Sequence, residues 1–408
     1  MDTSRFERSD FGTCAAGGEL GFSWFQPAPM PQSLPLENET IMALSDAEAA
    51  LGRLNGVARR LREPDLLLRP YAVREALASA RIEGTQARLT DVFQAEAAGA
   101  EPAYGDLRDL HAHLRAAEHG VREVRSRRLD LELLLQLHAM LMHGSTRTAS
   151  GGRLRDQPVW IGSPTDRPDN AVFVPPIGQA MHDSLADFEA FLLRPPRLPT
   201  LVRCALLHYQ FLTIHPLLDG NGRIGRLLVL LFLIQEERLP VPLLYLSAYF
   251  ERHRVEYYDR LQAVREKGRI QEWLQFFLTA VSAQADDAMQ RADSLLTLRE
   301  QYRSELAGNR SRASEAIELV FDNPILTTRL VRSSLGVTNQ GALNLIRHLE
   351  GRGWLSKLEV RQGRGGSVFW LAPQVYAVIS DEPAEGYRER EASELSTQST
   401  ESLTGVRN

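Results

Sequence analysis

Apolar residues recur at helical spacing along most of this chain. Leu51 and Leu54 share one face with Val57, because residues three or four positions apart point the same way on a helix. A second periodic stretch runs from about 68 to 82 and stops before Gly84, a typical C-terminal helix cap. The same spacing predicts further helices over 106–145, 179–193, 199–214, 223–237 and 252–288. We therefore expect a mainly α-helical fold.

Two stretches interrupt this helical pattern. Residues 151–178 are rich in Gly and Pro and contain the apolar runs Val159–Ile161 and Val172–Val174, which is typical of a β-hairpin. Residues 1–35 are rich in Gly, Pro and Ser and show no period. We interpret them as an extended arm that packs on the rest of the chain.

The pattern changes again over residues 313–378. A helix–turn–helix pattern, with Gly336 in the turn and a second helix over 339–350, is followed by two short strands around a glycine-rich run. This order of elements is typical of a winged helix. We expect 289–312 to be a linker, and the polar segment 379–408 to be disordered because it offers few side chains for a core.

The predicted winged helix raises the question of DNA binding. Asn339 and Gln340 begin its second helix and suit adenine edges, and Arg361 and Arg364 on the wing suit phosphates. Residues 312–378 carry eight basic and five acidic side chains, a modest balance of +3. A protein-interaction or dimerisation module is therefore an equal alternative.

Composition narrows the class of protein. An apolar fraction of 43% is ordinary for a globular chain, and a net charge of −5 disfavours a protein that coats nucleic acid or an anionic membrane. The longest apolar run, Leu227 to Ile234, is too short to span a bilayer. Cys14 and Cys204 give no disulfide framework. We expect a cytoplasmic protein without membrane contact.

The segment 215–226 carries the candidate chemistry. Its glycines permit a tight turn into a helix N-terminus, where backbone N–H groups favour anions. His215 can accept a proton near neutral pH, Asp219 can hold Mg²⁺, and Arg223 and Arg226 share a helix face suited to a polyphosphate. This combination predicts a phosphoryl- or nucleotidyl-transfer site. The segment reads His215-Pro216-Leu217-Leu218-Asp219-Gly220-Asn221-Gly222-Arg223-Ile224-Gly225-Arg226.

This segment resembles the signature HPFx(D/E)GNGRxxR of the Fic family, with Leu217 where the family usually has Phe. The resemblance implies a Fic helical bundle with a β-hairpin flap, and an enzyme that transfers AMP from ATP to a Tyr, Thr or Ser hydroxyl of a protein, including itself. It also implies that His215 is the base, that Asp219 is the Mg²⁺ ligand and that Arg226 meets the γ-phosphate. The implied nucleotide-binding residues are Asp219, Gly220, Asn221, Gly222, Arg223, Ile224, Gly225 and Arg226.

A second signature, (S/T)xxxE(G/N), matches Ser79 to Gly84. Glu83 lies in the last turn of a predicted helix, where a carboxylate opposes the helix dipole by about 0.3–1 kcal/mol, so we expect a cationic partner. The resemblance implies that Ser79 and Glu83 are inhibitory and that Glu83 takes Arg226 away from the γ-phosphate. Relatives that transfer a terminal phosphate carry Lys at the position of Gly222, so Gly222 favours AMP transfer.

The resemblance also assigns the hairpin and an aromatic pair. The flap, residues 158–176, is expected to hold a target segment as an added strand, unless it only covers the core. Tyr257 and Tyr258 match a pair that lines the nucleotide pocket in relatives, although an aromatic pair on a helix is as often part of the core; Arg265 stands where some relatives have Asn. The flap residues expected to border the nucleotide are Val159, Trp160, Ile161 and Gly162.

Together these patterns predict an arm and inhibitory-helix region over 1–110, a Fic core over 111–288, a linker over 289–312, a winged helix over 313–378 and a disordered tail over 379–408. The expected partner is a target protein with an acceptor hydroxyl. A homodimer and DNA binding through the winged helix stay open. Two alternative functions also stay open: a DNA-binding regulator whose Fic core senses a nucleotide, and the same core using another donor such as UTP or CDP-choline.

Overall fold

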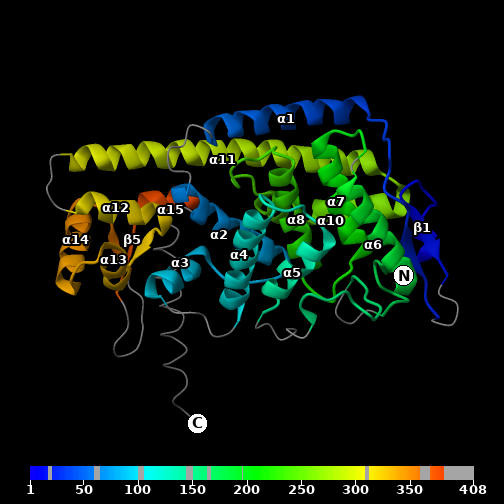
Figure 1. The fold of residues 1–408 in the computed structure, drawn as a ribbon, viewed down its shortest axis with the longest axis horizontal. Helices are drawn as coiled ribbons and strands as arrows, with labels where there is room; N and C mark the ends of the chain where they lie inside the picture. Colours follow the sequence, from blue (N-terminus) through cyan, green and yellow to red (C-terminus); the bar gives the residue numbers. More distant parts are fainter. Residues whose placement is uncertain are drawn as a thin grey trace, which may run out of the picture. The chain divides into compact units, whose positions relative to one another are not determined.

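A computed structural model describes residues 1–16, 21–58, 65–99, 105–143, 150–162, 167–194, 196–307, 312–358 and 368–380. Helices make up most of these residues, as Figure 1 shows, and the prediction of a mainly α-helical fold is confirmed. Among the described residues, no helix is both long enough and apolar enough to cross a bilayer.

The chain forms two compact units that do not follow its order. The first unit consists of Met1–Pro64, Glu75–Ala87 and Pro102–Met289, and the second takes in Asp65–Arg74, Arg88–Glu101 and the described residues from Gln290 onward. Two helices, α2 (Asp65–Ile82) and α11 (Ile270–Leu306), each begin in one unit and end in the other. The division therefore differs from the consecutive segments that the sequence suggests.

Two central helices carry the first unit. Helix α7 (Thr200–Ile214) is buried at every residue after Thr200, and α8 (Asn221–Gln235) is buried from Ile224 to Ile234. They approach closely at Gly225, where an added Cβ would lie 3.0 Å from Leu212 Cδ2. Helices without a polar face must be enclosed by others. The enclosing helices include α4 (Asp106–Glu123), α5 (Leu131–Leu141), α6 (Gly178–Leu193), α9 (Ser247–Arg252) and α10 (Arg254–Lys267).

Helix α1 (Asn38–Ala58) runs beside the first part of α11, as Figure 1 shows. Thr40 Oγ1 donates to Gln271 Oε1 at 2.8 Å, and Arg53 pairs with Asp286 at 2.9 Å. The expected single helix over 252–288 is divided at Gly268, which has a φ of +65° and ends α10. Helix α11 then extends through most of the stretch expected to be a linker.

The N-terminal arm contains a hairpin that the sequence pattern did not reveal. Strands β1 (Gly12–Ala15) and β2 (Trp24–Pro27) pair antiparallel, with Thr13 opposite Gln26. Phe25 packs in a buried cluster with Phe173, and its N–H donates to Val174 O at 2.8 Å. The arm is thereby fixed to the flap.

The second unit holds the elements expected for residues 313–378. Thr327 caps α13 by accepting from Leu330 N at 3.0 Å, and Gly336 forms the turn with a φ of +62°. Three short strands form an antiparallel sheet in the order β3–β5–β4. The winged-helix interpretation stays a prediction, and Arg361, Arg364 and residues 381–408 lie outside the described residues. The elements of the unit after α11 are α12 (Ala313–Asp322), β3 (Ile325–Leu326), α13 (Thr328–Leu335), α14 (Asn339–Gly351), β4 (Ser356–Leu358), β5 (Phe369–Leu371) and α15 (Pro373–Ile379), and α3 (Leu89–Ala98) joins them.

Candidate active site

The segment 215–226 forms the turn between α7 and α8. His215 ends α7 in the left-handed region with a φ of +50°, and Gly220 precedes α8 with a φ of +74°. The side chain of Asn221 holds the turn closed, since its Oδ1 accepts from Leu217 N at 3.0 Å and its Nδ2 donates to Leu217 O at 2.8 Å. The predicted phosphate-binding role of Asn221 therefore rests on its backbone N–H, because the amide is already engaged.

His215 is half-buried and held in one orientation. Its Nδ1 lies 3.3 Å from Leu212 O, so the ring donates from Nδ1 and leaves the lone pair of Nε2 available. Burial, and then the nearby Arg155 cation, lower the pKa of His215 to about 3. The imidazole is therefore neutral near neutral pH and its Nε2 lone pair is free, and the lowered pKa makes it a weaker base than an ordinary histidine.

Glu83 bridges two arginines of α8. Its Oε1 accepts from Arg226 Nη2 at 3.0 Å, and its Oε2 lies 2.8 Å from Arg223 Nε. The predicted pair with Arg226 is present, and the second pair, with Arg223, was not foreseen. Burial alone would lower the pKa of Arg226, but the Glu83 carboxylate raises it overall.

Ser79 completes the grip on Arg226, whose residue is only 6% exposed. Arg226 Nε donates to Ser79 Oγ and Arg226 Nη2 donates to Ser79 O, both at 2.8 Å. Because Ser79 and Glu83 lie one turn apart near the end of α2, the same helix face contacts both Nε and Nη2 of the guanidinium. The shared helix face expected from their spacing is present, and their inhibitory role stays a prediction.

Gly222 makes room for the carboxylate. A Cβ at this position would lie 2.4 Å from Glu83 Oε1 and 2.9 Å from Arg226 Nη1. Any larger side chain would have to displace the carboxylate or the guanidinium. Gly222 thus allows Glu83 to enter the site, a role that the sequence alone did not indicate.

Asp219 lies at the entrance of the turn. Its Oδ1 accepts from Gly220 N at 2.7 Å and lies 3.6 Å from Arg223 Nη2. Asp109 on α4 interacts electrostatically with both groups. Burial raises the pKa of Asp109, the Arg223 cation lowers it and the Asp219 carboxylate raises it further. Sequence reasoning missed Asp109, because nothing in the spacing of α4 brings it to this turn.

The two tyrosines expected at the nucleotide pocket have different environments. Tyr257 is 1% exposed, and its hydroxyl donates to His208 Nε2 at 2.8 Å, while His208 Nδ1 donates to Gly225 O at 2.8 Å. Tyr258 is 44% exposed. The structure thus favours the core interpretation for Tyr257, which braces α8 from behind, and leaves Tyr258 accessible.

The flap is less regular than predicted. In place of two strands, the described residues of the flap contain one isolated bridge, between Ile161 and Phe173, with N···O distances of 2.8 and 3.1 Å. Pro158, Pro175 and Pro176 remove N–H donors that longer strands would need. Residues 163–166 lie outside the described residues. Trp160, at 41% exposed, faces solvent beside the bridge; of the other predicted flap contacts, Val159 and Ile161 are half-buried and Gly162 is exposed.

Arg265 connects the flap to α7. Its guanidinium lies 4.0 Å from the centre of the Phe173 ring, and it donates to Thr213 Oγ1 at 3.2 Å and to Leu212 O at 3.3 Å. These contacts show that Arg265, at a position where some relatives have Asn, packs against the flap and the end of α7.

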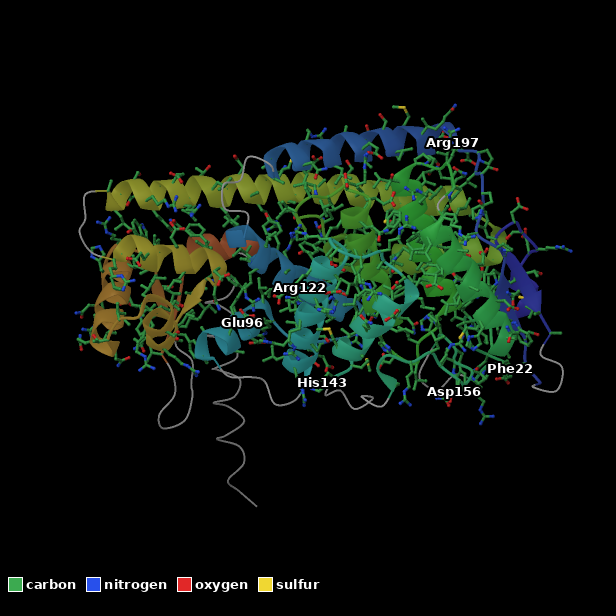
Figure 2. The ribbon with its side chains drawn as sticks, in the orientation of Figure 1. Phe22, Glu96, Arg122, His143, Asp156 and Arg197 are labelled. Atoms are coloured by element: carbon green, nitrogen blue, oxygen red, sulfur yellow. The ribbon has the colours of Figure 1, made fainter. Side chains whose placement is uncertain are left out.

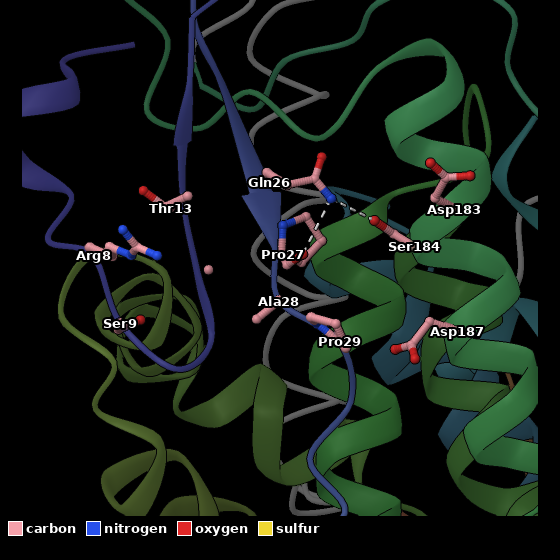
Figure 3. A pocket seen from close by; sticks show the side chains of 11 residues that line it. Arg8, Ser9, Thr13, Gln26, Pro27, Ala28, Pro29, Asp183, Ser184 and Asp187 are labelled. Atoms are coloured by element: carbon pink, nitrogen blue, oxygen red, sulfur yellow. Dashed lines mark hydrogen bonds between the residues drawn. The ribbon is translucent and has the colours of Figure 1, made fainter.

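A cavity of about 350 Å³ lies elsewhere in the first unit, between the arm and α6. Figure 3 shows Gln26 reaching Ser184 across it, with Asp183 and Asp187 on one side. None of the predicted site residues lines this cavity. We therefore place the candidate site at the turn between α7 and α8.

Comparison with known families and proteins shows what this chain is similar to. Residues 41–122 match the Fic/DOC family N-terminal model, and residues 128–233 match the Fic/DOC family model. A solved Fic family protein from Desulfovibrio desulfuricans G20 has a similar fold, with a TM-score of 0.52 and 21% identity over 84% of this chain and 98% of that one.

Curated relatives match over shorter stretches. The chain is 30% identical to protein adenylyltransferase Fic of Culex quinquefasciatus over 155 residues, which is 36% of this chain and 27% of the relative. It is 26% identical to protein adenylyltransferase fic-1 of Caenorhabditis elegans over 210 residues, or 49% of this chain and 37% of the relative. The chain thus spans well under half the length of either relative.

Proposed function

We propose that this chain, in which residues 41–122 and 128–233 match the two Fic/DOC family models, is a protein adenylyltransferase that moves AMP from ATP onto a Tyr, Thr or Ser hydroxyl of a protein, including itself. The observation that carries the proposal is Glu83, which occupies Arg223 and Arg226 on the helix that begins beside His215. Relatives named protein adenylyltransferases support the same reaction.

Each group at the turn has a task in this reaction. The α- and β-phosphates of ATP meet the N-terminus of α8, where Gly222 N–H and Arg223 offer donors and the helix dipole favours negative charge. Arg226 binds the γ-phosphate. His215 Nε2 takes the proton of the acceptor hydroxyl, whose oxygen attacks the α-phosphorus as pyrophosphate leaves.

Mg²⁺ fits this set of residues. Among the described residues there is no group of three or more metal-ligating side chains. A single carboxylate, that of Asp219, is enough for Mg²⁺, which usually keeps several waters and binds phosphate oxygens. When bound, the ion would neutralise charge on the phosphates and on the leaving pyrophosphate. Asp219 would hold it at the mouth of the turn.

Glu83 keeps this activity low. A γ-phosphate would have to compete with Ser79 and Glu83 for Nε and Nη2 of Arg226, and Arg223 forms an ion pair with the other carboxylate oxygen. Hydrogen bonds to charged groups contribute about 1.5–3 kcal/mol each. Their removal should therefore raise the rate of AMP transfer at least about tenfold.

The test is incorporation of label from α-labelled ATP with Mg²⁺ into the purified protein. We expect Glu83→Gly and Glu83→Gln to label faster than the parent, and Glu83→Gly/His215→Ala not to label. A matched control is Glu236→Gln, because Glu236 pairs with the buried Arg203 at the opposite ends of the same two helices. This control should label like the parent.

The outcomes separate the competing functions. Label from UTP or CDP-choline, but not from ATP, would keep the site and replace the donor. No label from any donor in the Glu83 variants would rule out the transferase and favour a regulator that only senses nucleotide.

A further inference from the structure

Arg155 is a buried cation outside both signature motifs. It lies just before the flap, where the neighbouring Asp156 is labelled in Figure 2, and it is only 5% exposed. Within the part of the chain that the structure describes, no carboxylate forms an ion pair with it, and burial lowers its pKa to about 10. An unpaired buried charge is costly unless other groups satisfy its donors. Such a residue needs an explanation.

The side-chain donors of Arg155 are satisfied by four backbone carbonyls. Its Nε donates to His215 O at 2.8 Å, and its Nη2 donates to Ile214 O at 3.3 Å. Its backbone N–H donates to Pro216 O at 2.9 Å. These contacts surround the left-handed residue His215, and the first two carbonyls belong to the C-terminal end of α7, where the helix dipole favours a cation.

The other two carbonyls belong to the two ends of the flap. Arg155 Nη1 donates to Gln157 O at 3.2 Å, and Nη2 donates to Pro176 O at 2.5 Å. Gln157 precedes the flap and Pro176 is its last residue. One rigid, planar guanidinium therefore joins both ends of the flap to the backbone of His215.

We infer that Arg155 is a positioning residue that fixes the distance between the flap and His215. The inference rests on the proposed function, in which His215 takes the proton of the acceptor hydroxyl, and on the role that the resemblance implies for the flap, which is to hold the acceptor segment. Because backbone carbonyls take its side-chain donors, Arg155 would act through these segments and not by contact with ATP or the acceptor. It keeps the acceptor oxygen in line with the imidazole by holding the two backbones that carry them.

The first test does not depend on activity. Hydrogen exchange, followed by mass spectrometry on the full chain, is compared for the parent, Arg155→Ala and Arg155→Lys. In Arg155→Ala we expect faster exchange both in the flap, at the Ile161–Phe173 bridge, and around residues 214–217. The matched control is Arg203→Lys, which alters a buried arginine near the start of α7 and should change neither segment. Unchanged exchange, or a change in only one segment, would overturn the inference.

The second test uses the Glu83→Gly background and self-labelling from α-labelled ATP. A displacement of about 1 Å between reacting groups can cost about 100-fold in rate. We expect Arg155→Ala to lower the maximal rate to about this extent while the KM for ATP stays the same, and millimolar methylguanidinium to restore part of the rate. The maximal rate of Arg155→Lys should lie between the rates of Arg155→Ala and of Glu83→Gly alone, because lysine lacks the planar guanidinium.

The results distinguish the two proposals. If Glu83→Gly itself does not label, the proposed function fails and hydrogen exchange still decides whether Arg155 joins the two segments. If Arg155→Ala labels at the rate of Glu83→Gly, the positioning role is wrong. A loss of rate that comes with weaker ATP binding, a lower melting temperature and no guanidinium rescue would reduce Arg155 to a general stabilising role.

Discussion

At the scale of single residues, the candidate inhibition depends on the absence of a Cβ atom at Gly222. Gly222 leaves room for Glu83 Oε1, which an added Cβ would approach to 2.4 Å. The carboxylate can then reach Arg223 and Arg226 together. Position 222 and position 83 should therefore behave as one coupled pair.

We predict that Gly222→Ala destabilises the parent by about 1–3 kcal/mol through overpacking against Glu83. In the Glu83→Gly background the same change should cost about 1 kcal/mol less or become neutral, because Ala is the better helix former. Urea unfolding of the four proteins measures this coupling. Gly225→Ala, which meets Leu212 in either background, is the control and should cost the same in both. An equal loss of unfolding free energy for Gly222→Ala in the parent and in the Glu83→Gly background would contradict the coupling of positions 222 and 83.

From the sequence, residue-level prediction could reach only the proximity that the spacing of side chains encodes. The spacing of residues 215–226 placed His215, Asp219 and the two arginines at one turn, and the structure brings them there with Glu83. Arg155 could not be found in this way, because its partners are main-chain carbonyls that any sequence provides. The side chain of Asn221 likewise binds its own loop.

At the scale of elements, the flap depends on the N-terminal arm. Strand β2 donates a hydrogen bond to the end of the flap, and Phe25 fills the space beside Phe173. The flap has only one bridge of its own in the described residues. Its order therefore comes largely from packing against the arm.

We predict that Phe25→Ala lowers the free energy of unfolding by about 3–5 kcal/mol, the usual cost of emptying a buried phenylalanine site. It should also speed proteolytic cleavage within residues 158–176, as limited proteolysis with fragment mass analysis would detect. Phe188→Ala removes an equally buried ring between α6 and α7. That control should lose similar stability without selective cleavage of the flap; equal cleavage in both variants would disprove the dependence.

Helices were predicted better than strands, for a physical reason. An amphipathic or fully apolar helix produces a recognisable pattern of apolar residues over three or more turns, as α7 and α8 do. The pairs β1–β2 and β3–β5 involve four residues or fewer per strand, too few for an alternating pattern. The break at Gly268 was missed because apolar spacing continues on both sides of it.

At the scale of the whole molecule, the first unit encloses several histidines in their neutral form. Burial lowers the pKa of His113 and His208 to about 3 and that of His138 to about 4. Each value lies below the ordinary 6.5 of an unfolded chain. Between the folded-state and unfolded-state pKa values, the unfolded chain binds more protons than the folded chain. The free energy of unfolding therefore rises with pH in this range, and this stability is lost as the pH falls below about 6.5.

We predict that the free energy of unfolding decreases from pH 7 to pH 5.5, by up to about 1.4 kcal/mol per pH unit for each buried histidine. Urea unfolding across this range gives the slope. His208→Gln should reduce the slope, whereas His182→Gln, a change at an exposed position on α6, should not. An identical slope in His208→Gln and the parent would show that this histidine does not carry the effect.

The assignment of segments to the two units was beyond reach of the sequence. Thr327 donates to Ala97 O at 2.6 Å, and Asn323 Nδ2 donates to Phe93 O at 3.0 Å, so α3 belongs with residues more than two hundred positions away. Neither contact leaves a mark on hydrophobic spacing. The sequence could suggest only that the pattern of expected helices and strands changes near residue 313.

The bridge made by Glu83 is almost entirely ionic, and its carboxylate side chain is 29% exposed. The side chains of its partners Arg223 and Arg226 are only 12% and 4% exposed, so dissolved ions screen these pairs only in part. The proposed inhibition therefore rests on a contact that salt weakens in part, whereas the apolar packing of α7 and α8 is not weakened by salt. The proposed basal rate would rise modestly with the ionic strength of the surroundings.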